Sequence, residues 1–315
     1  MNKSNLNVLN YSRIALVGDS YTQHGWWPVE VIHTLATHTP RLNVKIFNCG
    51  IGGDTMRGAS KRLNWDVAPL EPTHLFVLLG INDCRYTRYQ CKADFSTEIA
   101  NWPNVFKIYE KSLYSIVRYS LNNNWQLLLG TPILLPESVD SIYDVQRINE
   151  VLAGFADIVR KISCERNIIL VDLNEQMQSV YKSWHGSAEK DLFSSDYIHP
   201  NQLGYRIIGR LFLKELGFQV NVPKSVTEGK DKFSVFNRTE QQIFAIEQKI
   251  RHCAFLEYRM IEDRIVNITE KEKVQYWQNL CNQEKTPDWL CCTIKDWIVW
   301  HNQIGQLHKE LENLQ

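Results

Sequence analysis

The amino-acid sequence predicts an α/β fold with a doubly wound, five-stranded parallel sheet, followed by a C-terminal α-helical extension. Helical patterns separate short apolar runs, and strands that alternate with helices build a parallel sheet. After about residue 222, apolar residues instead recur at three- and four-residue spacing, which is typical of amphipathic helices. The five strand-like runs lie at residues 13–17, 43–47, 74–79, 126–130 and 167–171.

The helices between these strands are predicted from apolar residues that repeat on one side. The first begins at Pro28, because proline suits the first turn of a helix. Two more are expected at about residues 104–121 and 141–165. The last spans about residues 200–216 and ends before Gly217, since glycine often terminates helices.

A polar stretch divides the chain into two parts. We expect residues 1–222 to form the α/β domain, residues 223–231 a linker and residues 232–315 the helical extension. The extension matches no motif that carries chemistry. It either packs on the α/β domain, offers a surface to a second copy of the chain or to another partner, or forms a lid that shapes the substrate pocket.

Two or three antiparallel helices are expected in the extension. The first begins at Thr239, which forms a capping-box pattern with Gln242, and its apolar seam runs from Ile243 to Ile268. That seam is too long to leave in water. The other helix starts are Thr269-x-x-Glu272 and Thr286 before Pro287.

The charge balance argues against nucleic acid or an anionic membrane as the main partner. Lys and Arg together number 35, as do Asp and Glu, so the formal net charge is zero. The N-terminal residues lead into no long apolar stretch, and no window has the length of a transmembrane helix. We therefore expect a cytoplasmic protein without a membrane span.

The cysteines and glycines indicate neither a metal nor a nucleotide cofactor. Eight cysteines are present, none in a C-x-x-C pair or with the spacing of zinc ligands, and we interpret them as free thiols. Gly50-x-Gly52-x-x-Thr55 is an incomplete dinucleotide fingerprint, and it follows the second strand rather than the first. We therefore expect no cofactor and no metal.

Ser20 is the first candidate for chemistry. It follows the run Ile14–Val17 and the turn Gly18-Asp19, so it lies at the carboxyl end of a predicted central strand, where open α/β sheets place their sites. A serine is a poor nucleophile unless a histidine, itself oriented by a carboxylate, takes its proton. Asp196 and His199, just before the last predicted helix, can supply both groups.

Two other strand ends carry hydrogen-bond donors. Backbone N–H groups of glycine and the amide of asparagine are the donors that an oxyanion hole needs. Two simpler interpretations stay open. In one, the glycines only make a turn. In the other, Asn82 and Asp83 only cap a helix. The two segments are Asn48-Cys49-Gly50-Ile51-Gly52-Gly53-Asp54-Thr55 and Gly80-Ile81-Asn82-Asp83.

In this order and spacing, the motifs resemble those of the SGNH (GDSL-type) hydrolase superfamily. The resemblance implies a flavodoxin-like sheet, with Ser20 as nucleophile, His199 as general base and acid, and Asp196 as its orienting carboxylate. It also implies an oxyanion hole made by the Ser20 N–H, the Gly53 N–H and the Asn82 side chain. The matching motifs, within about residues 12–218, are Gly18-Asp19-Ser20, Gly53, Gly80-x-Asn82-Asp83 and Asp196-x-x-His199.

Several residues near these motifs have competing interpretations. Tyr21 stands where many members carry leucine or threonine, which affects the expected substrate rather than the chemistry. His24 either lines the pocket or lies on a helix surface, and we favour the surface. Trp26 and Trp27 either form an aromatic platform for a sugar or belong to the core, which we favour.

Two downstream residues are rivals to the proposed base and its partner. His185 is an alternative general base, but no carboxylate precedes it by three residues. Asp172 ends a predicted strand, and we expect it to brace a loop rather than to orient His199.

The predicted function is hydrolysis of a carboxylic ester through a covalent acyl-Ser20 intermediate. The chain has no G-x-S-x-G motif, which argues against the other large class of α/β hydrolases. The expected substrate is a small-molecule or carbohydrate ester, as for esterases and acetylesterases. One alternative is an O-acyltransferase that moves an acetyl or other acyl group to or from a carbohydrate. The other alternative is a non-catalytic binding or assembly protein with the same fold. For any of these functions, a homo-oligomer formed through residues 232–315 also stays open.

Overall fold

A five-stranded parallel sheet forms the centre of the molecule. The computed structural model describes residues 11–38, 43–91, 94–137, 142–184, 192–225, 227–228, 236–261, 273–281 and 288–315. The strand order is β2-β1-β3-β4-β5, and every neighbouring pair is parallel, which confirms the predicted doubly wound sheet. The strands are β1 (Arg13–Gly18), β2 (Lys45–Gly50), β3 (His74–Leu78), β4 (Gln126–Gly130) and β5 (Ile169–Val171).

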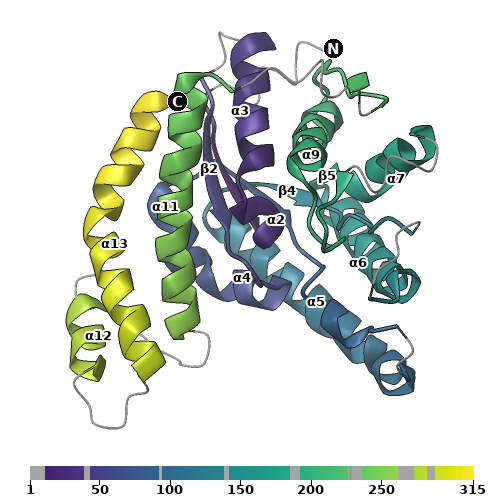
Figure 1. Cartoon of the computed structure of the whole chain (residues 1–315), viewed down its shortest axis with the longest axis horizontal. Coiled ribbons are helices and arrows are strands. Elements are labelled where there is room, and N and C mark those ends of the chain that lie inside the picture. Colours follow the sequence, from purple (N-terminus) through teal and green to yellow (C-terminus); the bar gives the residue numbers. More distant parts are fainter. Residues whose placement is uncertain are drawn as a thin grey trace.

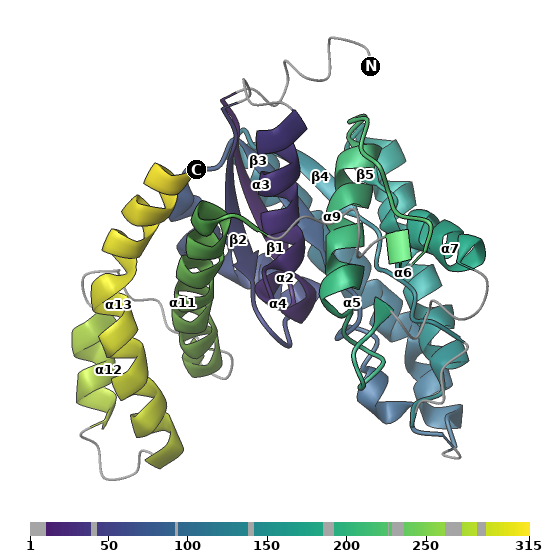
Figure 2. The ribbon, with the colours of Figure 1, turned by 45° about the horizontal axis from the view of Figure 1, so that its top comes forward.

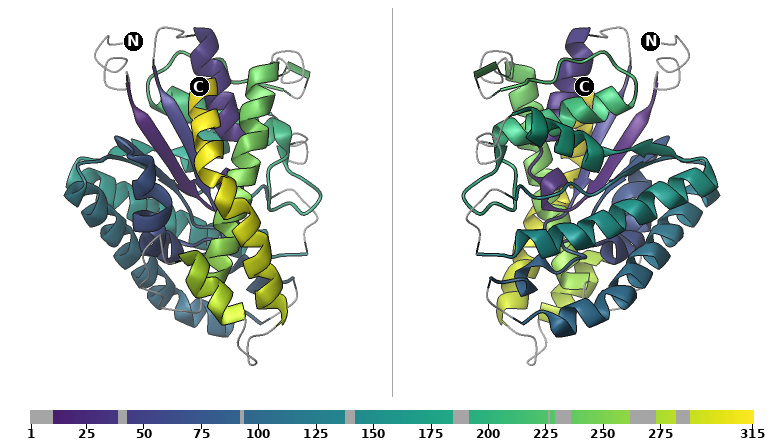
Figure 3. Two further views of the ribbon diagram at one scale, coloured as in Figure 1. Left: turned by 90° about the vertical axis from the view of Figure 1, so that its left-hand side faces the viewer. Right: turned by 90° about the vertical axis from the view of Figure 1, so that its right-hand side faces the viewer.

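Helices cover both faces of the sheet, as Figures 1 and 3 show. Helices α3 and α9 pack together on one face, and α4, α5 and α6 lie on the other. The helices are α2 (Ser20–Gln23), α3 (Trp26–His38), α4 (Met56–Arg62), α5 (Ser96–Asn122), α6 (Val145–Arg166), α7 (Leu173–Ser183), α9 (Gln202–Glu215), α11 (Arg238–Ile261), α12 (Lys273–Cys281) and α13 (Asp288–Leu314). Short helical turns lie at Leu63–Val67, Ala68–Leu70 and Tyr86–Arg88.

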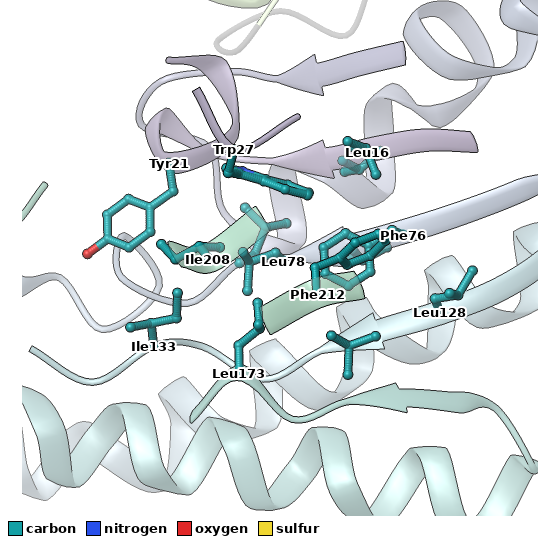
Figure 4. Close-up of a cluster of buried hydrophobic side chains, with 14 of the residues drawn as sticks. Leu16, Tyr21, Trp27, Phe76, Leu78, Leu128, Ile133, Leu173, Ile208 and Phe212 are labelled. Atoms are coloured by element: carbon teal, nitrogen blue, oxygen red, sulfur yellow. The ribbon is translucent and has the colours of Figure 1, made fainter. Parts of the chain in front are cut away.

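Three aromatic side chains centre the core between the sheet and the α3–α9 layer (Figure 4). The ring of Phe76 on β3 lies 4.9 Å from that of Phe212 and 5.8 Å from that of Trp27, centroid to centroid. All three residues are almost completely buried. Their apolar area fixes α3, which follows the Ser20 segment, and α9, which follows the His199 segment, on the same face.

A buried ion cluster joins the same two helices. Glu30 on α3 accepts hydrogen bonds from Arg206 Nε at 2.6 Å and from Arg210 Nε at 2.8 Å, both on α9. The Glu30 side chain has no exposed surface, so its charge requires these partners. The pairing therefore sets the position of α9, and with it the loop that ends in His199.

The C-terminal helices pack along one edge of the sheet (Figures 1 and 2). Helix α11 contacts α3 and β2, and α13 contacts α11. Ile243, Ile246 and Ile250 of α11 are buried and join the main core. A second, smaller cluster consists of Cys253, Trp277, Ile294 and Trp297. The extension was expected to pack on the α/β domain, to offer a surface to another chain or to form a lid. The described C-terminal helices pack on the α/β part of the same chain.

The last residue of the chain pairs with the edge strand of the sheet. The Gln315 side chain accepts a hydrogen bond from the Ile46 N–H and donates one to the Ile46 carbonyl oxygen, each at 2.7 Å. One helical turn earlier, Glu312 forms ion pairs with Arg13 and Lys45. An open strand edge is a template for association with another chain, and these contacts cover part of it.

Several predicted boundaries were wrong. Strand β2 continues through Asn48–Gly50, for which the sequence predicts a loop, because the polar Asn48 is buried against α2 and donates to Thr22 O. A Cβ atom at Gly50 would lie 2.2 Å from the Gln23 N atom, so the glycine lets α2 approach. Helix α5 begins at Ser96, before Pro103, rather than at residue 104.

Two helix starts also differ from the predictions. Helix α11 begins at Arg238, and its capping box joins Asn237 and Glu240, not Thr239 and Gln242. Helix α7 was not predicted, although its cap Asp172, which accepts from the Glu175 N–H, has the D-x-x-E spacing of a capping box.

Some predictions fall on residues outside the described ranges. These are residues 226 and 229–231 of the predicted linker, the seam positions Ile265 and Ile268, and the helix starts Thr269, Glu272, Thr286 and Pro287. Within the described residues, every helix is too short or too polar to cross a membrane.

Candidate active site

Ser20 lies at the carboxyl end of the central strand β1. Asp19 follows the strand, and its carboxylate caps α2 by accepting a hydrogen bond from the Tyr21 N–H at 2.9 Å. Ser20 is therefore the first residue of α2 and is only half-buried. Burial raises the pKa of the Asp19 carboxyl to about 7.

His199 and Asp196 meet Ser20 in a continuous hydrogen-bonded line. The Ser20 Oγ lies 2.8 Å from Nε2 of His199, and Nδ1 of His199 lies 2.6 Å from Oδ2 of Asp196. The other oxygen of Asp196 accepts from the Ser194 hydroxyl at 2.6 Å and from the N–H groups of Ile198 and His199. Partial burial alone would raise the pKa of Asp196, but these hydrogen bonds lower it to about 2.

The loop that carries His199 is tied at both ends. The Ser194 N–H donates to the His199 carbonyl oxygen at 2.8 Å, and Phe193 pairs with Pro200 in a single antiparallel bridge. The Tyr21 hydroxyl, next to Ser20, donates to the Ile198 carbonyl oxygen. The loop is thus held against α2, which keeps the histidine ring within reach of the serine.

The predicted hydrogen-bond donors flank Ser20 on neighbouring strands. Because β1 lies between β2 and β3, the segment after β2 passes on one side of Ser20 and the segment after β3 on the other. Gly53 has a φ of +81°, a value that favours glycine, and a Cβ atom there would meet nothing within 4 Å. The Asn82 Nδ2 donates to the Asp54 carbonyl oxygen at 3.0 Å, which fixes the orientation of the amide.

Hydrogen bonds of Asp83 and Arg62 hold these donor segments in place. The partly buried Asp83 carboxylate accepts from the Met56 N–H at 3.0 and 3.1 Å, and desolvation raises its pKa to about 8. Arg62 donates from Nε to Asp54 Oδ2 and from Nη2 to the Cys49 carbonyl oxygen, both at 2.8 Å. Asp83 therefore does cap a helix, because Met56 is the first residue of α4. Arg62 was not predicted, because its only local signal is a basic residue at the end of a short helix.

The comparison with protein families matches the part of the chain that contains these segments. Residues 16–207, more than half of the chain, match the GDSL-like lipase/acylhydrolase family. The chain belongs to this family. The resemblance inferred from the four sequence motifs is thereby confirmed.

Relatives of this GDSL-like chain include esterases. An acetylxylan esterase of Geobacillus stearothermophilus is 25% identical over 189 residues, which cover 60% of this chain and 80% of that enzyme. A solved structure of an acetyl xylan esterase from the same organism has a TM-score of 0.55 and 23% identity, and covers 67% of this chain and 97% of that one. Family and relative together support activity on esters.

A second solved structure resembles the GDSL-like chain over nearly its whole length. A gut microbial diltiazem-metabolizing enzyme superposes with a TM-score of 0.74 at 15% identity, and covers 97% of this chain and 93% of that one. At this coverage, the similarity in fold includes the C-terminal helices.

His24 lies closer to the site of this GDSL-like protein than we expected. Its ring is edge-on to that of His199, with 5.4 Å between the centroids, and also contacts Tyr205. Partial desolvation and the neighbouring His199 lower the pKa of His24. The residue is nevertheless exposed, as the favoured surface interpretation requires.

The remaining rivals lie away from Ser20 or outside the described residues. Trp27 is buried in the core, whereas Trp26 packs on Phe236 and Phe244. Asp172 braces its loop by accepting from the Thr131 hydroxyl at 2.9 Å and by pairing with Arg160, as predicted. His185 lies outside the described residues. Within the described ranges, no group of three or more His, Cys, Asp or Glu side chains is arranged to hold a metal ion.

Proposed function

We propose that this protein hydrolyses a carboxylic ester through a covalent acyl intermediate on Ser20. The observation that carries the proposal is the line of hydrogen bonds from Ser20 through His199 to Asp196, with lengths of 2.8 and 2.6 Å. Serine hydrolases need this order of nucleophile, base and orienting carboxylate. Family membership and the acetylxylan esterase relative support it independently.

In the first half of the reaction, Oγ of Ser20 attacks the carbonyl carbon of the ester. Nε2 of His199 takes the hydroxyl proton, while Asp196 accepts the hydrogen bond from Nδ1–H and so selects the tautomer whose Nε2 is free to act as base. When the tetrahedral intermediate collapses, the C–O bond to the alcohol breaks. The imidazolium of His199 then returns its proton to the departing alkoxide.

The negative oxygen of the tetrahedral intermediate is bound by donors from three strand ends. These are the Ser20 N–H after β1, the Gly53 N–H after β2 and the Asn82 amide after β3. One amide hydrogen of Asn82 is used on Asp54 O, and the other remains available for the oxyanion. Donors held in place in this way stabilise the charge as it develops.

In the second half, water attacks the acyl carbon and gives a proton to His199. The bond between the acyl carbon and Oγ of Ser20 then breaks, His199 returns the proton to Oγ, and the carboxylic acid leaves. If a sugar hydroxyl takes the place of water, the same steps transfer the acyl group. We therefore keep O-acyl transfer as the second form of the proposal. Every group that these steps require is a side chain or an N–H of this chain.

For the substrate, we propose a short-chain ester of a carbohydrate or small molecule. The support is the name of the acetylxylan esterase relative, which is 25% identical over 189 residues. A cytoplasmic location and a homo-oligomer through residues 232–315 stay predictions, which cell fractionation and light scattering would test.

A fluorophosphonate probe tests the proposal directly, because it reacts with activated serines. We expect it to label the purified protein at Ser20 and to spare a folded Ser20→Ala variant. A panel of aryl esters from acetate to palmitate, with and without candidate sugars, then gives the acyl preference and separates hydrolysis from transfer. A folded protein that is neither labelled nor active on any ester would support the binding or assembly alternative instead.

A further inference from the structure

A chain of buried charges runs from the C-terminal helix α11 to the loop beside Ser20. Arg251 on α11 lies 3.2 Å from Asp66, and Asp66 also pairs with Arg62 at the end of α4. Arg62 in turn donates to Asp54 at 2.8 Å. Asp54 is the residue after Gly53, and its carbonyl oxygen accepts the hydrogen bond of Asn82.

The four charged side chains form an electrically balanced cluster. Two guanidinium groups face two carboxylates, and none of the four side chains is more than 5% exposed. Burial alone would raise the pKa of Asp66, but the charges of Arg251 and Arg62 hold it below its usual value. At Asp54, burial outweighs the charge and the hydrogen bond of Arg62, so the pKa of that carboxyl is raised. Buried charges of this kind are stable only while they are paired.

Three further titratable groups, Cys49, Glu247 and His308, border the cluster without changing its net charge at neutral pH. Burial raises the pKa of the Cys49 thiol to about 12. Burial raises the pKa of Glu247 to about 8 and, together with the charge of Arg251, lowers that of His308 to about 4. All three groups are therefore mainly uncharged at pH 7. The balance of the cluster depends on the two arginines and the two aspartates alone.

Helix α11 reaches the same loop by a second path. The Gln248 Nε2 donates to the Gln23 carbonyl oxygen at 3.0 Å, and the Gln23 side chain accepts from the Gly52 N–H. Gly53 therefore has Gly52 on one side and Asp54 on the other, and each of these neighbours is linked to α11.

We propose that Arg251 is a positioning residue for the oxyanion hole, so that α11 helps to build the active site. Arg251 acts by balancing Asp66, which leaves Arg62 to hold Asp54 and, through it, the Gly53 N–H and the Asn82 amide. This inference rests on the proposed function, since it deepens the role of the same site.

Loss of Arg251 leaves one net negative charge in the cluster that holds Asp54, the residue after Gly53. It also leaves Arg62 alone to serve both Asp54 and Asp66. Both effects act on the transition state, in which the oxygen becomes negative, more than on the neutral ester. We therefore expect kcat to fall about 10- to 100-fold in Arg251→Met, with little change in KM, which is less than the roughly 10²- to 10³-fold for removing one donor outright because the donors themselves remain.

Charge-restoring variants separate this role from a merely structural one. Arg251→Lys keeps the positive charge and is expected to recover most of kcat. The double variant Arg251→Met/Asp66→Asn removes one charge of each sign and is expected to have a kcat above that of Arg251→Met. The matched control is Glu240→Gln, which changes a buried hydrogen bond between α11 and His33 of α3 but does not touch the cluster. We expect its kcat to stay within about twofold of wild type.

The kinetics are measured with one aryl ester at pH 7, and folding is checked by circular dichroism and thermal unfolding. A folded Arg251→Met with wild-type kcat, or a double variant slower than Arg251→Met, would overturn the inference alone. If Arg251→Met does not fold, the double variant decides: a folded double variant within a few-fold of wild type supports the inference, and one more than about tenfold slower overturns it. If the wild-type protein does not turn over the ester, the proposed function is overturned, and this inference fails with it.

Discussion

The Ser20 hydroxyl lies 2.8 Å from Nε2 of His199, although the two residues are 179 positions apart in the chain. The Ser20 segment precedes α3, and the His199 segment precedes α9. The two helices are held together by Glu30 and its arginine partners and by the shared aromatic core. The geometry of the reacting pair is thus a product of the α3–α9 layer.

Replacing Ser20 by alanine is expected to abolish ester turnover while leaving the fold intact. The hydroxyl contributes no core packing, whereas loss of a nucleophile costs on the order of 10⁴-fold or more in rate. Steady-state kinetics and circular dichroism on the same preparation test this. Near-normal turnover by a well-folded Ser20→Ala protein would exclude the serine mechanism.

His199→Ala is expected to cost nearly as much as Ser20→Ala, and Asp196→Asn less. Base and nucleophile act as a unit, so the double variant Ser20→Ala/His199→Ala should be no slower than either single variant. Asp172→Asn is the control, because this carboxylate braces Thr131 and Arg160 and does not contact His199. A fall in kcat for Asp172→Asn as large as that for Asp196→Asn would argue against our choice of orienting carboxylate.

Asn82→Ala is expected to lower kcat far more than it raises KM. The amide meets the negative oxygen mainly in the transition state, which is worth roughly 3 kcal/mol for one donor. The two constants are obtained from initial rates over a range of ester concentrations. A change confined to KM would mean that Asn82 binds the ground-state substrate instead.

Raising the pH from 5 to 8 is expected to lower the free energy of unfolding less in Glu247→Gln than in the wild type. In the unfolded chain the pKa of a glutamate is about 4.3, whereas burial raises that of folded Glu247 to about 8. Between these values the folded protein keeps a proton that the unfolded chain has lost. The stabilisation is therefore complete below about pH 4 and disappears as the pH rises through 8.

Urea unfolding at the two pH values measures this difference. We expect the fall in the free energy of unfolding to be smaller in the variant by more than about 1 kcal/mol. Asp19 and Asp83 also have raised pKa values, so part of the fall should persist. The exposed Glu310 provides the control, and an effect of Glu310→Gln equal to that of Glu247→Gln would contradict the assignment.

Gln315→Ala is expected to destabilise the edge of the sheet. The variant loses both hydrogen bonds to Ile46, at a cost of about 1 kcal/mol each. It also exposes part of the β2 edge, so light scattering should show more association. Gln303→Ala is the control on the same helix, because the hydrogen bond of that amide within the described part of the chain goes to the Val299 carbonyl oxygen of its own helix. Equal unfolding midpoints for the two variants would contradict this role.

The sequence by itself was sufficient for the sheet and for the motifs on its strand ends. Buried parallel strands are short apolar runs, and the turn after each run is local, so both can be recognised one segment at a time. Ser20, Gly53, Asn82, Asp196 and His199 could therefore be named, although their catalytic roles stay proposals. Local patterns were less reliable where a polar residue is buried, as at Asn48, which belongs to β2.

Only the tertiary structure decided how distant segments support the site. The strand order places Ser20 between the segments of Gly53 and Asn82, and no local pattern specifies that order. Likewise, Arg251 is an ordinary basic residue in an amphipathic helix until its contact with Asp66 is seen. The physical reason is that a charge can be buried only opposite another charge, and long-range packing chooses which charge that is.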